Sequence, residues 1–303
     1  MKRILILADM EGCCGIHDLS DETYCISCMA AEVDYIIHVL RRLIPCEITI
    51  LDCHNDGRSL QAFCEMKQIS LINHVWSLNS VKYDMAFLVG FHGMYGQAGV
   101  LSHTIRSDIV SMKLGDKYIG EVGLLTDWLA ALGIPTVYIS GDQSIKAELQ
   151  DFTGVFLPVK GQEMGVLSLD DMKMAIQIAI EKAIINEASC HYREAPVRIK
   201  LIGETYEKHI PAECFEKEEG EVIFHNSGHL IQSLPLFCEC LNCAEWFQQT
   251  RFAQLKQRLF QINQKRINQD KNAHEILSTK SWRSLTDEDF YYLTLLARRI
   301  EGH

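Results

Sequence analysis

Residues 2–12, KRILILADMEG, lead from an apolar segment directly into two carboxylates, Asp9 and Glu11. The segment from Lys2 to Ala8 predicts a buried strand, because Ile, Leu and Ala follow one another without a turn residue. Residues two apart in a strand point to the same side, so the two carboxylates can converge just past the strand's carboxyl end. This spacing suits a shared cation, although a lone Asp after a strand is usually a turn or helix cap.

The next 180 residues alternate between strand patterns and helix patterns. Apolar strands are predicted at 46–51, 85–89, 136–139 and 155–159, and amphipathic helices at 30–43, 120–132 and 169–185. Strands that alternate with helices of this length predict an α/β fold with a doubly wound, largely parallel sheet. We place this metal-binding catalytic domain at residues 1–190.

Residues 191–303 have a different pattern. The segments VRIKLI (197–202) and GEVIFH (220–225) are typical of strands, and a helix-prone stretch runs from Leu234 to about Lys265. A last helix is predicted at Asp287–Ile300 with Thr286 as its cap. These features predict a smaller α+β domain with a helical tail, which packs on its own chain or contributes to oligomerisation.

The composition narrows the class of protein. The formal net charge of the 303 residues is −11 and no basic stripe is present, which argues against nucleic acid as a partner. No apolar run reaches the roughly 18–20 residues of a membrane span, so we expect neither a signal peptide nor contact with a membrane. The location expected for such a chain is the cytoplasm.

Twelve cysteines fit free thiols in a reducing compartment. Two local groups could instead bind zinc or exchange disulfides: Cys25-x-x-Cys28 and Cys238-x-Cys240-x-x-Cys243. Neither has the second paired group or the histidine that a structural zinc site normally adds, so we favour a space-filling role.

Further polar residues follow the other predicted strands. His54 follows the second strand, His92 follows the third, and Glu121 begins the next helix. In open α/β sheets ligands bind outside the carboxyl ends of the strands, so these residues can join Asp9 and Glu11 in one crevice. Taken singly, each imidazole can be a hydrogen-bonded structural residue, and Glu121 can favour the positive end of a helix dipole.

Two imidazoles with three carboxylates favour zinc or a similar transition metal over magnesium or calcium, which prefer oxygen ligands. Five ligands exceed the three of a typical single catalytic zinc, so two zinc ions per chain with Asp9 as the bridge are the simplest arrangement. His103, in the segment GVLSHT, is the candidate catalytic residue. Histidine changes charge near neutral pH, so it can donate a proton to a leaving amine or hold an oxyanion; a structural role is the alternative.

Six segments of the chain resemble, in order, the signature segments of the zinc-dependent D-aminopeptidase family, the metallopeptidases of a dipeptide-transport operon. They are ADMEG (8–12), DCHNDGRS (52–59), FLVGFHG (87–93), GVLSHT (99–104), GEVGL (120–124) and ISGD (139–142). The resemblance covers residues 2–190 and continues more faintly to about 250. The stretch between Gly15 and Ala30 is shorter than in the family, and residues after about 250 look like an addition.

The resemblance implies a two-zinc aminopeptidase that releases D-amino acids from the amino end of short peptides and assembles as a ring-shaped homo-oligomer. It implies that Asp9 bridges both zincs, that Glu11 and His92 complete one site, and that His54 and Glu121 complete the other. His103 matches the family's catalytic histidine.

We therefore expect a di-zinc metallohydrolase that cleaves short peptides with a metal-activated water, with His103 assisting departure of the amine. Asp56 and Arg58 are weaker candidates for substrate binding, since an Asp-Gly-Arg turn in solvent is an equally simple explanation. One alternative is a two-metal amidase or phosphoesterase, although no phosphate loop of the form GxxxxGK[ST] is present. The other is a non-catalytic, metal-stabilised peptide-binding protein.

Overall fold

The computed structural model describes residues 1–54, 57–78, 82–186, 189–203, 206, 210–212, 214–245, 249 and scattered positions between 270 and 296. The chain divides into two compact units, residues 1–199 with 224–232, and residues 200–223 with 233–303. The domain boundary at residue 190 stays a prediction.

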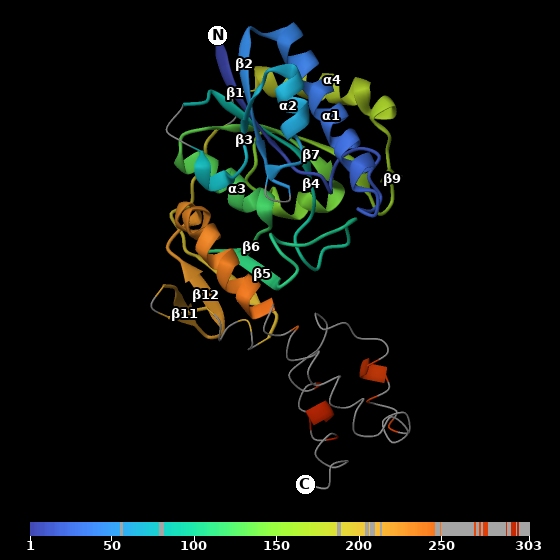
Figure 1. The fold of residues 1–303 in the computed structure, drawn as a ribbon. Coiled ribbons are helices and arrows are strands. Elements are labelled where there is room, and N and C mark those ends of the chain that lie inside the picture. Colours follow the sequence, from blue (N-terminus) through green and yellow to red (C-terminus); the bar gives the residue numbers. More distant parts are fainter. Residues whose placement is uncertain are drawn as a thin grey trace. The chain divides into compact units, whose positions relative to one another are not determined.

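A seven-stranded sheet organises the first unit (Figure 1). Its order is β3 (Ser70–Ile72), β2 (Cys46–Asp52), β1 (Lys2–Ala8), β4 (Met85–Phe91), β7 (Thr136–Asp142), β8 (Val155–Gly161) and β9 (Gly165–Val166). All neighbours are parallel except β8 and β9. The chain proceeds from β1 through β2 to β3 on one side and adds β4, β7 and β8 on the other. This confirms the predicted doubly wound, largely parallel α/β fold.

The strand order reverses between β1 and β4, which makes their carboxyl ends a topological switch point. In the register of the sheet, Ala8 lies opposite Asp52 of β2 on one side and Val89 of β4 on the other. β1 and β2 therefore end at the same level and β4 continues two residues further, to Phe91, so the residues that follow the three strands enter the same space.

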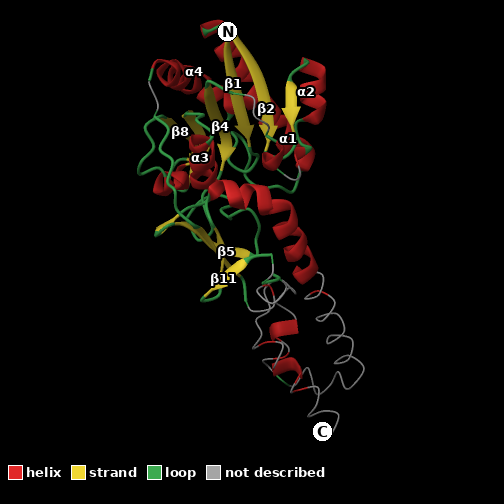
Figure 2. Ribbon diagram, turned by 90° about the vertical axis from the view of Figure 1, so that its left-hand side faces the viewer, coloured by secondary structure: helices red, strands yellow, loops and turns green. Residues whose placement is uncertain are grey.

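Helices cover the two faces of this sheet (Figure 2). α1 (Glu22–Leu43) and α4 (Leu169–Ile185) contact each other, and their buried residues share a core cluster with Ile4, Ile6, Phe87 and Val89. The alternate residues of the same strands are also buried but lie outside this cluster, because successive strand side chains point to opposite faces. α3 (Glu121–Ala131) contacts β4 and β7, and the short α2 (Gln61–Lys67) contacts β3.

α1 begins at Glu22, capped by the side chain of Asp21, and not at Ala30 as we predicted. Cys25 and Met29 are buried and extend the apolar stripe of Val33 toward the amino end. By length and composition α1 could cross a membrane, which is weak evidence because buried core helices pass the same test. Its packing on α4 and the sheet accounts for its apolar face.

A second sheet has the order β11 (Glu216–Glu218), β12 (Glu221–Phe224), β10 (Val197–Leu201), β5 (Ile109–Leu114) and β6 (Lys117–Tyr118). β10 and β12 match the predicted strand segments, whereas β5 and β6 were not predicted. Residues 227–245 are helical. The remainder of the predicted helix up to Lys265 and most of the predicted tail helix lie outside the described residues.

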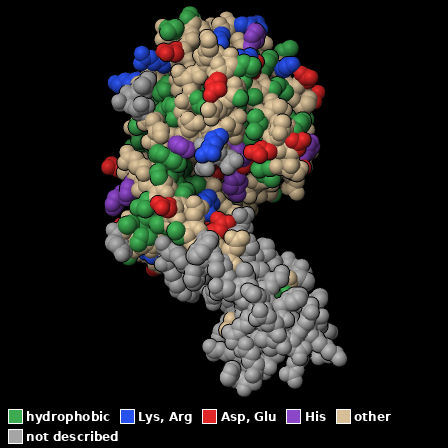
Figure 3. Space-filling view, in the orientation of Figure 1, with side chains coloured by type: hydrophobic (Ala, Val, Ile, Leu, Met, Phe, Trp, Pro, Cys, Tyr) green, Lys and Arg blue, Asp and Glu red, His purple; other side chains and the backbone are tan. Residues whose placement is uncertain are grey.

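The described side chains on one face of the molecule carry both signs of charge (Figure 3). Acidic, basic and apolar side chains are interspersed there. The net charge of −11 is thus not gathered into one acidic surface on this face.

Candidate metal centre

Polar residues from four segments meet at the carboxyl edge of the sheet, at the switch point. Asp9 and Glu11 follow β1, His54 follows β2, His92 follows β4, and Glu121 is the first residue of α3. Their ligand atoms, with those of His103, form two groups in which all atoms lie within 4.8 Å of one another: Asp9, Glu11 and His54, and His92, His103 and Glu121. The structure brings together all five predicted ligands and the predicted catalytic histidine.

Asp9 and Glu11 reach this site from a turn and not from an extended strand. β1 ends at Ala8, after which Cys13 N–H bonds to the carbonyl of Met10 and Gly12 N–H bonds to that of Gly90. A Cβ on Gly12 would lie 1.7 Å from the carbonyl oxygen of Phe91, so only glycine allows this close approach. We predicted correctly that the carboxylates of Asp9 and Glu11 converge, but strand alternation alone does not explain it, because this turn also positions them.

A buried lysine stabilises this turn through hydrogen bonds to its backbone. Lys160, on β8, is fully buried, and its Nζ donates to the carbonyl oxygens of Glu11 at 2.7 Å and Ile16 at 2.6 Å. Glu32, on α1, is also fully buried and accepts from Cys14 N–H at 2.7 Å. These contacts fix the backbone that carries Glu11. Sequence reasoning missed both residues; the only signal was a lysine within the otherwise apolar strand sequence.

The first group is built around the carboxylate of Asp9. His54 Nδ1 lies 3.0 Å from Glu11 Oε2 and 3.7 Å from Asp9 Oδ1. Asp52, the last residue of β2, accepts from His54 N–H at 3.1 Å and from Leu60 N–H at 2.8 Å. Asp52 therefore binds the backbone at both ends of the loop from His54 to Leu60.

The second group lies on the other side of Asp9. His92 Nε2 is 3.5 Å from Asp9 Oδ2 and 3.4 Å from Glu121 Oε1. The His103 ring stacks on that of His92 with centroids 4.0 Å apart, and His103 Nε2 is 4.0 Å from Glu121 Oε1. The two oxygens of Asp9 thus face different imidazoles, one from each group.

Backbone carbonyls orient two of the rings. His92 Nδ1 lies 3.0 Å from the carbonyl oxygen of Gly93, and His103 Nδ1 lies 2.9 Å from that of Leu101. A carbonyl can only accept, so Nδ1 carries the proton and Nε2 is left as the nitrogen that faces the carboxylates. Such a bond from the far nitrogen is the usual support of a metal-binding imidazole.

The segment that carries His103 has a strained backbone. Leu101 and Ile105 have φ values of 62° and 58°, a region that β-branched residues such as Ile rarely enter. The segment is held by Val100 N–H to Asp142 Oδ2 at 2.9 Å, by His103 N–H to the Gly93 carbonyl at 3.2 Å, and by Ile105 N–H to Glu121 Oε1 at 2.7 Å. Strain of this kind persists where surrounding contacts over-determine the conformation, often at functional sites.

Burial and mutual charge shift the pKa values of the group. Burial and the neighbouring Glu11 raise the pKa of Asp9 to about 7. Burial opposes ionisation of Glu11 as well, but the hydrogen bond and charge of His54 lower its pKa to about 2. Burial disfavours the charged imidazoles, yet the adjacent carboxylates raise the pKa of both His54 and His92 to about 10. In the metal-free chain, protonated imidazoles take the place of cations between the carboxylates.

The residues present fit metal ions. Asp9 Oδ2 is buried and makes no hydrogen bond to the part of the chain that the structure describes. It lies among oxygen and nitrogen donors of the types that zinc accepts. A cation would satisfy this oxygen and would remove the repulsion that raises the pKa of Asp9.

The weaker substrate-binding candidates are not part of this cluster. Asp56 lies outside the described residues. Arg58 is exposed and lines a surface groove with Asn73 and His74, and none of the proposed ligands is among the described residues of that groove. A role for either residue in substrate binding stays a prediction.

Comparison with known proteins assigns the chain to a family. The chain is similar in structure to the Zn-dependent D-aminopeptidase DppA from Bacillus subtilis, described as a self-compartmentalizing protease, with a TM-score of 0.70 and 18% sequence identity. The match covers 80% of this chain and 98% of that chain, and at this identity it shows a shared fold. None of the curated proteins matches the chain. The family model described as D-aminopeptidase matches residues 1–214, and since this is more than half of the chain, the protein belongs to the D-aminopeptidase family and is a metallo-aminopeptidase.

Proposed function

We propose that this protein binds two zinc ions per chain and releases D-amino acids from the amino end of short peptides. The observation that carries the proposal is the convergence of six predicted site residues at the switch point of a D-aminopeptidase-family fold, around a buried Asp9 oxygen without a hydrogen-bond partner in the described chain. We propose the same residues as zinc ligands: Asp9, Glu11, His54, His92 and Glu121.

Asp9 is the proposed bridging ligand. Its Oδ1 faces His54 and its Oδ2 faces His92, so each oxygen can serve a different ion. The family resemblance pairs Glu11 with His92 and His54 with Glu121. In the structure His54 lies beside Glu11, and His92 beside Glu121. The division of the other four ligands between the two ions stays a prediction.

Zinc at this position supplies a Lewis acid for the scissile carbonyl and lowers the pKa of a water molecule toward neutrality. His103 is the proposed proton donor to the departing amine. Its Nδ1 is committed to the carbonyl of Leu101, so Nε2 is the nitrogen that can exchange a proton with substrate. The contacts of Val100 and Ile105 hold the His103 segment and keep this nitrogen beside Glu121.

We propose that the protein acts as a homo-oligomer. The self-compartmentalizing character of the similar DppA protein supports this proposal. A ring, as the family resemblance implies, would enclose the site and restrict the substrate to short peptides.

Substrate specificity tests the proposed function directly. The zinc-loaded protein is expected to release alanine from D-Ala dipeptides at least about tenfold faster than from L-Ala dipeptides, and to leave N-acetylated peptides intact. Chelation should abolish turnover and zinc should restore it. Simple amides and phosphate esters serve as competing substrates. Faster cleavage of L-Ala dipeptides than of D-Ala dipeptides would contradict D-specificity. Faster cleavage of a phosphate ester or a simple amide than of peptides would indicate another hydrolase. Peptide binding without turnover would indicate a protein that has lost its catalytic activity.

Metal binding is expected to release protons. At pH 7 His54 and His92 are protonated in the metal-free chain because their pKa values are about 10, and both must become neutral to bind zinc. About two protons should therefore leave the histidines, with a further fraction from Asp9, whose pKa is about 7. Since protons compete below these pKa values, the apparent zinc affinity should rise with pH up to about 10.

Calorimetric titration of zinc at pH 7 in two buffers with different ionisation enthalpies measures this release. Equal heats in the two buffers would show that no proton leaves, and would contradict the proposed participation of His54 and His92.

A further inference from the structure

The first turn of α3, which carries the proposed ligand Glu121, is not capped by its own residues. Gly120 is the residue that precedes the helix, and it has no side chain to accept a hydrogen bond from the first-turn N–H groups. Such N–H groups have no partner within a helix and normally require a side-chain acceptor or water.

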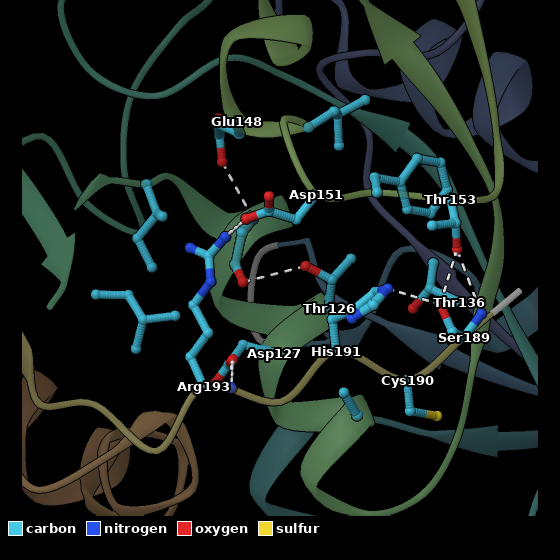
Figure 4. A pocket seen from close by; sticks show the side chains of 16 residues that line it. Thr126, Asp127, Thr136, Glu148, Asp151, Thr153, Ser189, Cys190, His191 and Arg193 are labelled. Carbon is cyan, nitrogen blue, oxygen red and sulfur yellow. Dashed lines mark hydrogen bonds and ion pairs between the residues drawn. The ribbon is translucent and has the colours of Figure 1, made fainter. Parts of the chain in front are cut away.

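A carboxylate from a later segment supplies this acceptor. Glu148, the last residue of the 3-10 helix η3 (Gln143–Glu148), accepts from Gly120 N–H at 2.7 Å and from Gly123 N–H at 3.1 Å, both through Oε2. Figure 4 shows Glu148 in the wall of the cavity that it lines together with Asp151 and Arg193. The other oxygen, Oε1, is buried and makes no hydrogen bond to any described residue. Within the described part of the chain, the carboxylate of Glu148 thus accepts hydrogen bonds from the start of α3 alone.

The glycines of the segment GEVGL fit this carboxylate. A Cβ on Gly120 would lie 2.7 Å from Glu148 Oε1 and 3.0 Å from Oε2, closer than ordinary contact. A Cβ on Gly123 would lie 3.4 Å from Oε2 and 2.7 Å from the Cβ of Ile119. Glycine at 120 leaves room for the carboxylate to reach the backbone on both sides of Glu121.

Glu148 is therefore linked to the metal centre through the backbone of Glu121. One oxygen holds the peptide groups one residue before and two residues after Glu121, which fixes the direction of its side chain. The Glu121 side chain places Oε1 3.4 Å from His92 Nε2 and accepts from the N–H of Ile105, two residues after His103. We propose that Glu148 is a positioning residue that aligns Glu121 for metal binding; this inference rests on the proposed function.

Cobalt binding tests the proposal without measuring activity. Loss of a residue that orients a metal ligand typically weakens metal affinity by about 10–100-fold, and we expect this loss for Glu148→Ala, with a changed visible spectrum of bound Co²⁺. Glu148→Gln keeps an oxygen acceptor but loses the charge, so we expect a smaller loss, about 3–10-fold. Hydrogen exchange of the metal-free chain should be faster at the amides of residues 120–123 in the Ala variant.

Asp21→Ala is the matched control. Asp21 also caps the start of a helix, as the residue directly before α1, by accepting from Tyr24 N–H at 3.0 Å, but α1 carries none of the proposed ligands. This variant should lower the thermal midpoint and leave the cobalt affinity and spectrum unchanged. If Glu148→Ala behaves like this control, Glu148 only caps a helix and the inference is overturned.

Two further outcomes are separable. If Glu148→Ala does not fold, the Gln variant decides, and an affinity and spectrum identical to wild type would overturn the inference. If the wild-type chain itself binds no cobalt, the proposed metal site is wrong, which is a different failure from unchanged binding in the variants.

Discussion

Replacement of Asp9 by asparagine is expected to remove bound zinc and to lower kcat/KM by at least about 10³-fold, which corresponds to roughly 4 kcal/mol of transition-state stabilisation. Asparagine keeps the shape of the side chain but offers only one oxygen, which is uncharged, between His54 and His92. The residue is 3% exposed, so no other anion from solvent can take its place. Metal analysis and D-Ala dipeptide turnover, measured on the same preparation, give the result.

The same variant is expected to stabilise the metal-free protein. The folded-state pKa of Asp9 is raised from 3.8 to about 7, so folding disfavours its ionised form. This penalty is absent below about pH 4, where the carboxyl is protonated in both states, grows up to about pH 7, and is constant above. At pH 8 metal-free Asp9→Asn should therefore unfold at a higher temperature than metal-free wild type. Zinc should raise the midpoint of wild type only, because only wild type binds it.

Asp127→Asn is the control for these measurements. Asp127 is a buried carboxylate of α3, but it accepts from Ser227 Oγ at 2.7 Å and from Arg193 N–H at 2.8 Å and lies outside both ligand groups. This variant should keep its zinc and its turnover. Full zinc content and activity in Asp9→Asn would rule out Asp9 as a ligand.

The sequence was sufficient to predict five strands of the first sheet, though not the short β3 and β9, and to gather the candidate ligands, because both depend on local signals. A parallel strand ends where its apolar run stops, and the carboxyl ends of adjacent strands lie at one edge of the sheet. Asp9 and His92 could thus be placed together across 82 intervening positions without knowing any contact. The same logic placed Glu121 at the start of the next predicted helix, although β5 and β6, which were not predicted, lie between β4 and this helix.

Contacts that support these residues from distant segments could not be predicted in this way. Lys160 looks like a surface lysine of an edge strand, and only the turn that follows β1 makes its two carbonyl partners available. Glu148 belongs to a short 3-10 helix with no sequence pattern of its own, and its partners are backbone N–H groups, which every residue but proline has. Cys25, for which we favoured a space-filling role over metal binding, is buried in α1 as a small apolar residue.

Replacement of His103 by alanine is expected to lower kcat by about 10²–10⁴-fold while both zinc ions stay bound, because general acid–base catalysis contributes about this factor. His103 Nε2 lies 4.0 Å from Glu121 Oε1, which is the longest of the imidazole–carboxylate distances in the site. This longer distance favours contact of His103 with substrate over binding of a metal ion. KM should change little, since the side chain acts on the leaving amine.

His92→Ala provides the contrast for this prediction. His92 is buried and its Nε2 lies within 3.5 Å of both Asp9 and Glu121, so its removal should release metal together with activity. His103 stacks on His92 and belongs to the same group of possible ligands, which makes metal content the deciding measurement. If His103→Ala loses one equivalent of zinc, His103 is a ligand and the proton must come from another group. If it keeps both ions and full kcat, its strained backbone segment serves structure alone. Retained zinc with a collapsed kcat is the combination that assigns proton transfer to His103.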